Sequence, residues 1–258
     1  MAAADRHAWT EPGVEDLGGG VYRIPLPLPM DGLKAVNVYA IADDQGIDLI
    51  DAGIALVPAR EGLTKGLRQI GYELGDIRNF FVTHIHIDHY SLAVELRQTL
   101  RNVITLGEGE RANIAALHDM ARGLSNRIFG GDLHRLALSD YLGSLRRTLA
   151  LPDARLLPAH GPVTGSTHDR VNELLAHHDL RLAETRQAVQ AGRATAYEVA
   201  RAIKWTRQQR LFTELDLLSQ FLAANETAAH LEVLTLRGQL THEVSADGID
   251  LYQLAPAD

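Results

Sequence analysis

The stretch FVTHIHIDHYSLA, residues 81–93, places three histidines and an aspartate directly behind an apolar run. His84 and His86 are two residues apart, so on an extended strand end their side chains project to the same side. Asp88 and His89 follow where the chain turns towards the next helix, and they reach the same place from another direction. Imidazole nitrogens and a carboxylate oxygen together suit zinc, and also iron or manganese. The stretch therefore predicts a divalent metal site.

The alternative is a set of polar side chains at an exposed strand end. A single histidine is better explained that way, because most histidines titrate without binding a ligand. Three imidazoles and a carboxylate this close together favour the metal, since the imidazoles would repel one another if all were protonated. Asp88 can also accept a proton, which makes it the candidate catalytic residue.

Composition limits the class of protein. The chain has 258 residues, 46% of them hydrophobic and 22% charged, which is ordinary for a globular protein with a real core. It contains no cysteine, so any metal is held by imidazole and carboxylate groups. The net charge of −8 argues against a dedicated nucleic-acid binder. The start of the sequence shows no basic region followed by an apolar one, and no run is long enough to cross a bilayer, so we expect a cytoplasmic protein without membrane contact.

Strand and helix patterns alternate in the first hundred residues, which predicts a layered α/β domain. The predicted strands are 19–28, 35–42, 46–53, 79–83 and 102–107, and the predicted helices are 56–70 and 92–100.

The pattern changes after Glu108 to helix and loop, with one predicted strand at residues 154–159, ARLLPA. From Val171 the chain is strongly helical, and it closes with two alternating runs around Asp247 and Gly248, a hairpin signal. We predict a metal-binding domain over residues 1–170 and a helical, winged-helix-like domain over residues 171–258.

Three motifs now point to a known family. THIHIDH, residues 83–89, resembles the HxHxDH signature of the metallo-β-lactamase-fold hydrolases, a superfamily that includes glyoxalase II, lactonases and RNA-processing nucleases. Asp51 in LIDAG resembles the family's aspartate at a strand end, and His160 in LLPAHGPV resembles its late GHGP element. The resemblance covers most of residues 20–165, and the helical tail resembles the winged-helix-like extension of one branch.

The resemblance implies a role for each residue. His84 and His86 would bind a first metal, while Asp88, His89 and His160 would bind a second. Asp51 would order the ligands from behind. The cofactor implied is Zn²⁺, one or two ions, with iron or manganese as alternatives.

Part of the family pattern is missing between residues 92 and 157. The family fold is an αββα sandwich with a further histidine and a bridging aspartate in this region. Asp132 and His134 come nearest to these ligands, although no convincing strand precedes them, and His118 lies within a helical pattern. We therefore expect an αββα sandwich with a truncated second β half and a junction near residues 123–135. Natural deletion or replacement by helices, completion by a second chain, and strands hidden in residues 108–150 all remain open.

A basic stripe is predicted in the tail, where Arg201, Lys204, Arg207 and Arg210 follow one another at helical spacing. It indicates either a phosphate-tracking surface or a solvated helix face, and the excess of acidic residues in the tail favours the solvated face.

The motifs and the composition leave three alternative functions. The first is a hydrolase in which metal-bound hydroxide attacks an ester, thioester or lactone of a small molecule; no cysteine and no GxSxG element offers another nucleophile. The second is a catalytically impaired metal-binding or interaction protein of the same fold. The third, disfavoured by charge, is a nuclease. A homodimer is left open.

Overall fold

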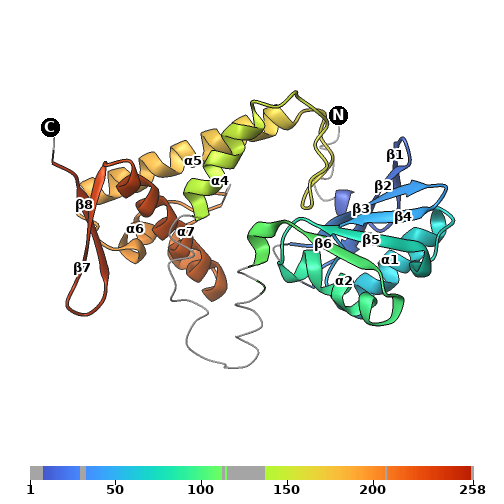
Figure 1. Ribbon diagram of the computed structural model, residues 1–258. Helices are drawn as coiled ribbons and strands as arrows, with labels where there is room; N and C mark the ends of the chain where they lie inside the picture. Colours follow the sequence, from blue (N-terminus) through green and yellow to red (C-terminus); the bar gives the residue numbers. More distant parts are fainter. Residues whose placement is uncertain (1–7, 30–32, 112–113, 115–136, 207, 257–258) are drawn as a thin grey trace. The chain divides into compact units, whose positions relative to one another are not determined.

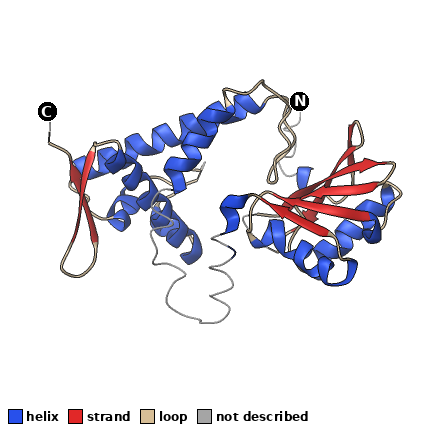
Figure 2. Cartoon of the chain, in the orientation of Figure 1, coloured by secondary structure: helices blue, strands red, loops and turns tan. Residues whose placement is uncertain are grey.

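The computed structural model describes residues 8–29, 33–111, 114, 137–206 and 208–256. The chain divides into two compact units. The first comprises Met1–Asn126 and Leu156–Thr164, and the second comprises Arg127–Arg155 and Gly165–Asp258. The predicted boundary after residue 170 stays a prediction. Figure 2 shows strands together with helices in the first unit, and helices with a strand hairpin in the second.

The first unit is built on one six-stranded sheet whose strands follow chain order from β1 to β6 (Figure 1). The first four strands pair antiparallel, and β4, β5 and β6 pair parallel. Parallel neighbours need a crossover, and the helices α1 and α2 supply the two crossovers. The elements are η1 Ala8–Thr10, β1 Glu15–Gly18, β2 Val21–Pro27, β3 Ala35–Asp43, β4 Gly46–Ile50, α1 Val57–Gln69, η2 Leu74–Asp76, β5 Ile77–Val82, α2 Ile87–Leu100, β6 Val103–Leu106 and η3 Glu108–Glu110. The α/β class is confirmed, and the five predicted strands and two predicted helices occur in the predicted order. Strand β1 was not predicted from the sequence.

One face of this sheet carries the hydrophobic core. Alternate side chains of the strands, such as Val38, Leu49 and Phe80, are fully buried against Leu63 of α1 and Leu92 of α2. A strand presents every second side chain to the same face, which explains why these residues alternate with polar or exposed ones. The helices lie on this face in Figure 1.

The opposite face of β3 contacts the segment Leu156–Thr164. Asn37 and Tyr39 both donate side-chain hydrogen bonds to the carbonyl oxygen of Pro158. The strand predicted at residues 154–159 is wrong, because the structure forms only an isolated bridge between Leu156 and Thr164. Proline has no N–H to donate to a sheet ladder, which explains why pairing stops at Pro158.

The second unit is a group of helices followed by a hairpin. Its elements are α4 Ala137–Thr148, α5 Thr167–Gln190, α6 Ala196–Ala202, η5 Phe212–Glu214, α7 Leu217–Leu236, β7 Leu240–Val244 and β8 Asp250–Leu254. The hairpin predicted around Asp247 and Gly248 is confirmed. Side-chain caps start the helices: Ser166 accepts from the Asp169 amide, and Thr195 forms a capping box with Glu198. The winged-helix-like description stays a prediction.

The basic stripe predicted in the tail is wrong. Helix α6 ends at Ala202, so Lys204 and Arg210 lie outside it, and Trp205 forms an isolated bridge with Arg210. Arg207 lies outside the described residues. No helix among the described residues has the length and the apolar character needed to cross a bilayer.

A second large sheet is absent from the described residues beyond Leu106, where β7 and β8 are the only paired strands and the other pairing consists of isolated bridges at Leu156–Thr164 and Trp205–Arg210. This agrees with the expected truncation of the second β half within the part of the chain that the structure describes. Residues 115–136, which include the expected junction, lie outside it.

A pair of histidines joins two helices in the core of the second unit. His178 Nδ1 on α5 lies 3.1 Å from His230 Nε2 on α7, and His230 Nδ1 lies 2.7 Å from the Glu226 carbonyl oxygen. His230 must carry its proton on Nδ1 to donate to that carbonyl, so its Nε2 accepts from His178. Burial is the main cause that lowers the pKa of both imidazoles. The neighbouring imidazoles lower the pKa of His178 further, and Arg181 lowers that of His230.

This pair predicts that acid destabilises the second unit. Both folded pKa values lie below the unfolded value of about 6.5, so the unfolded chain binds protons first. The stabilising contribution is complete above pH 6.5 and is lost as the pH falls below it. Urea unfolding at pH 7.5 and 5.5, followed by Trp205 fluorescence in a Trp9→Phe background, measures the loss. His178→Asn keeps an N–H donor but does not titrate, so it should reduce the pH dependence; an unchanged slope would contradict the assignment.

Candidate metal centre

The histidine cluster lies at the carboxyl end of β5, where the strand gives way to α2. Strand β5 ends at Val82 and helix α2 begins at Ile87, so His84 and His86 occupy the connection between them. Helix α2 starts earlier than the predicted residue 92, and Asp88 and His89 therefore belong to its first turn. An aspartate in a first helical turn is favoured by the helix dipole, and both side chains turn inward and are buried.

Asp51 lies behind this cluster at the end of the neighbouring strand β4. It is 2% exposed and adopts a left-handed backbone conformation with φ of 61°. Its carboxylate accepts hydrogen bonds from the Thr83 amide at 2.8 Å and from the Thr83 hydroxyl, and it lies 2.7 Å from His89 Nδ1. A positive φ is costly for a residue other than glycine, and these contacts offset the cost. Asp51 thus fixes the strand end and one imidazole together.

His160 reaches the same place from the loop at residues 158–161. Its Nε2 lies 3.2 Å from His89 Nε2 and 3.2 Å from Asp88 Oδ2, and His89 Nε2 lies 3.4 Å from the same oxygen. These three ligand atoms form a group that could hold a metal ion. Two ligands bound about 2.0–2.2 Å from a tetrahedral ion lie roughly 3.3–3.6 Å apart, close to the distances observed.

The protonation pattern also fits a cation. His89 Nδ1 faces the Asp51 carboxylate, and His160 Nδ1 lies 3.1 Å from the Ala35 carbonyl oxygen. Each Nδ1 must carry the proton to donate to these oxygens, which leaves the two Nε2 lone pairs facing each other and the Asp88 oxygen. Two lone pairs and a carboxylate repel one another unless a proton or a cation lies between them. Outward nitrogens bound to a carboxylate or a carbonyl are the usual support for metal-binding histidines.

His84 and His86 lie beside this group. The ring centroids of His84 and His86 are 4.3 Å apart, and those of His84 and His89 are 4.2 Å apart. Burial lowers the pKa of His84 most, and the neighbouring imidazoles of His89 and His86 lower it further, which favours the neutral form that binds metals. His86 is exposed.

The structure therefore brings together the side chains of His84, His86, Asp88, His89, His160 and Asp51. Among the described residues, Asp88, His89 and His160 are the only group of three that meets the distance limits of a metal site. The candidate ligands Asp132 and His134, and His118, lie outside the described residues.

The sequence analysis missed the polar residues that hold the His160 loop. Asn37 is fully buried in β3, between apolar neighbours in AVNVYAIA. A lone amide in such an apolar run indicates tertiary hydrogen bonds, because a buried polar side chain must find hydrogen-bond partners. Arg23 on β2 and Tyr39 on β3 belong to the same network.

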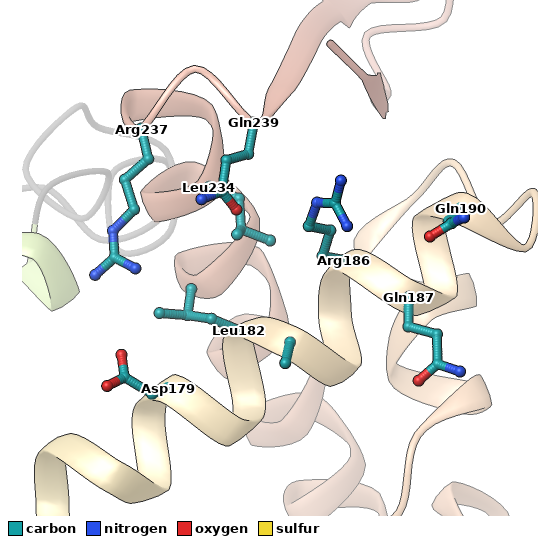
Figure 3. Close-up of a pocket in the computed structure, with 9 residues that line it drawn as sticks. Asp179, Leu182, Arg186, Gln187, Gln190, Leu234, Arg237 and Gln239 are labelled. Atoms are coloured by element: carbon teal, nitrogen blue, oxygen red, sulfur yellow. The ribbon is translucent and has the colours of Figure 1, made fainter. Parts of the chain in front are cut away.

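The second unit also contains a hollow. It has a volume of about 300 Å³ and lies between α5 and the end of α7, with Leu182 and Leu234 among its lining residues and the exposed Arg186 and Arg237 at its rim (Figure 3). Asp179 is the single acidic group in its lining, and no histidine accompanies it. It therefore offers neither a set of metal ligands nor an acid–base pair.

Comparison with known proteins finds similarity to metallo-beta-lactamase proteins in both sequence and structure. Residues 31–122 match the sequence model of the metallo-beta-lactamase superfamily. The crystal structure of a beta-lactamase domain protein from Burkholderia ambifaria is similar, with a TM-score of 0.72 and 25% identity, and the match covers 94% of this chain and 93% of that chain. A metallo-beta-lactamase family protein from Thermus thermophilus gives a TM-score of 0.68 at 20% identity, covering 93% of this chain and 100% of that chain.

Proposed function

This chain has the metallo-β-lactamase fold, and its residues 31–122 match that superfamily; we propose that it is a metal-dependent hydrolase of small-molecule esters, thioesters or lactones. The match to the superfamily supports the class of metal-dependent hydrolases, and the substrate class is our proposal. One observation supports the site: Asp88, His89 and His160 bring a carboxylate and two imidazoles within bonding distance of a common point.

Each residue of the candidate metal centre has a proposed role in binding metal or accepting a proton. His89 and His160 would hold a divalent ion together with Asp88, and His84 and His86 would hold a second one. When bound, the ion supplies Lewis acidity that polarises a carbonyl and lowers the pKa of a water molecule towards neutrality. We propose that Asp88 also accepts a proton during hydrolysis. We propose zinc, with iron or manganese as alternatives, because nitrogen and oxygen ligands suit all three.

Asp51 acts on the site without facing the substrate. It holds His89 Nδ1 and the Thr83 amide, so the ring orientation of His89 is set before any ion arrives. Preorganised ligands lower the cost of binding, because less conformational freedom is lost at that step. We propose a small-molecule substrate, no membrane partner and no nucleic acid, in a cytoplasmic protein.

Metal reconstitution tests this function. Protein stripped with a chelator is expected to be inactive, and added Zn²⁺, Fe²⁺ or Mn²⁺ is expected to restore hydrolysis of a generic thioester or lactone. His89→Ala should lose both bound metal and turnover, while His177→Ala, an exposed imidazole in the second unit, should keep both. Stoichiometric metal without turnover would favour the metal-binding protein without activity. Metal retained in His89→Ala would overturn the ligand assignment.

A further inference from the structure

His160 is the candidate ligand that depends most on support from elsewhere. It lies 71 residues after His89 in the sequence, in the segment Leu156–Thr164, which belongs to the first unit although its sequence neighbours belong to the second. The isolated bridge between Leu156 and Thr164 closes the base of this segment. The placement of the His160 imidazole therefore rests on contacts between this segment and the sheet.

Asn37 forms hydrogen bonds with the backbone of three residues that lie next to His160 in the sequence. Its Nδ2 donates to the Pro158 carbonyl oxygen at 2.9 Å and to the Gly161 carbonyl oxygen at 2.8 Å, and its backbone N–H donates to the Ala159 carbonyl oxygen at 2.7 Å. One residue thus holds the backbone on both sides of His160. Asn37 is 0% exposed, so each of these bonds is shielded from water and expensive to lose.

The side-chain amide of Asn37 is held with its nitrogen facing the loop that carries His160. Arg23 donates to Asn37 Oδ1 at 3.0 Å, which leaves Nδ2 facing the loop. The Arg23 guanidinium is itself fixed by the Glu15 carboxylate and the Trp9 carbonyl oxygen. An amide with both ends engaged cannot flip without losing bonds at each end.

Tyr39 adds a second donor to the same loop. Its hydroxyl donates to the Pro158 carbonyl oxygen at 2.8 Å, and burial raises its pKa to about 12, so the hydroxyl keeps its proton at ordinary pH. Ala35, on the same strand, offers the carbonyl oxygen that His160 Nδ1 faces. The side chains of Asn37 and Tyr39 are two residues apart on β3, so both reach the loop from the same face of the strand, and the Ala35 carbonyl oxygen adds a backbone contact.

We infer that Asn37 is a positioning residue that sets the place of His160 Nε2 beside Asp88 and His89, and thereby the affinity of the site for its metal. This inference rests on the proposed function, since it assigns Asn37 a role through a metal ligand. Asn37 touches neither the ion nor the substrate in this role.

Asn37→Asp tests the inference with a nearly isosteric change. The carboxylate still accepts from Arg23, but it removes the two N–H donors and turns an oxygen towards the Pro158 and Gly161 carbonyl oxygens. Residues that support metal ligands typically change metal affinity 10–100-fold, so we expect Zn²⁺ affinity, measured by chelator competition, to fall at least about 10-fold. Tyr39→Phe removes one hydrogen-bond donor and keeps the ring, so we expect a smaller loss of Zn²⁺ affinity. This variant replaces Asn37→Asp as the test if Asn37→Asp does not fold.

Asn102→Asp is the matched control. Asn102 is 6% exposed and donates to the Ile77 carbonyl oxygen, so it is a buried amide of the first unit that does not hold the loop. We expect Zn²⁺ affinity to stay within about 2-fold of the parent chain, because Asn102 contacts Ile77, the first residue of β5, whereas the candidate ligands follow the last residue of that strand, and sites without shared partners act independently. An equal loss in both aspartate variants would mean general destabilisation and would overturn the positioning role.

A double-mutant cycle with His160→Ala separates this inference from the proposed function. If Asn37 acts through His160, Asn37→Asp should cost little further Zn²⁺ affinity once His160 is gone. Additive losses, or normal Zn²⁺ affinity in Asn37→Asp and Tyr39→Phe while His160→Ala is impaired, would overturn the inference alone. Unchanged Zn²⁺ affinity in His160→Ala would instead overturn the ligand set of the proposed function.

Discussion

Asp88→Asn is expected to lower kcat/KM for thioester or lactone hydrolysis about 1,000-fold, since proton transfer by a positioned group contributes roughly 100–10,000-fold and a metal ligand is weakened at the same time. The Asp88 carboxylate lies 3.2 Å from His160 Nε2 and 3.4 Å from His89 Nε2. An asparagine keeps the shape but removes the negative charge and the capacity to accept a proton. The measurement is steady-state hydrolysis at saturating Zn²⁺, with the bound metal determined in the same samples.

Asp169→Asn provides the comparison for Asp88→Asn. Asp169 also lies in the first turn of a helix, α5, so both changes remove a favourable charge from a helix N-terminus. Asp169 belongs to the second unit, and its loss is expected to leave hydrolysis unchanged. If Asp88→Asn keeps more than about one tenth of the parent activity with its metal bound, Asp88 is not the proton acceptor we propose.

The sequence was sufficient to predict the first half of the fold and the core of the site. Residues 80–82 form a short apolar run, which is typical of strands in parallel sheets, so the end of β5 was placed to within a few residues. The four donor groups from His84 to His89 are local in sequence, and a strand end followed by a helix brings them together in almost any packing. Asp51 was identified through its resemblance to the family's strand-end aspartate, and it directly follows β4, the parallel neighbour of β5.

The contacts that hold His160 could not be predicted in this way. Asn37 and residues 158–161 are far apart in the sequence, and periodicity describes only one element at a time. The pattern in AVNVYAIA predicts a strand, but it does not show what Asn37 touches. The end of α6 at Ala202 was missed for a related reason: Trp205 donates to the Ala200 carbonyl oxygen and pairs with Arg210, and these tertiary contacts override helical spacing.

Phe80→Ala is expected to lower the free energy of unfolding of the first unit by about 3–5 kcal/mol, the usual cost of truncating a buried phenylalanine. Phe80 is 0% exposed and lies in the core between the sheet and its helices. Its strand, β5, ends at Val82, two residues before His84, so the truncation lies in the element that carries the candidate metal site. The chain has two tryptophans, one in each unit, so urea unfolding followed by Trp9 fluorescence in a Trp205→Phe background reports on the first unit.

Phe81→Ala is the control that distinguishes the two faces of the sheet. Phe81 is the next residue of β5 but is 41% exposed on the opposite face, so its truncation should cost no more than about 1 kcal/mol. Zn²⁺ at 100 times its Kd should restore about 2.7 kcal/mol to Phe80→Ala if the ion binds the folded state alone, because binding and folding are then linked. Equal losses in the two variants would show that the register of β5 is wrong, and with it the placement of the histidines that follow. A Phe80→Ala protein that gains nothing from Zn²⁺ would show instead that the site at the end of this strand does not hold the ion.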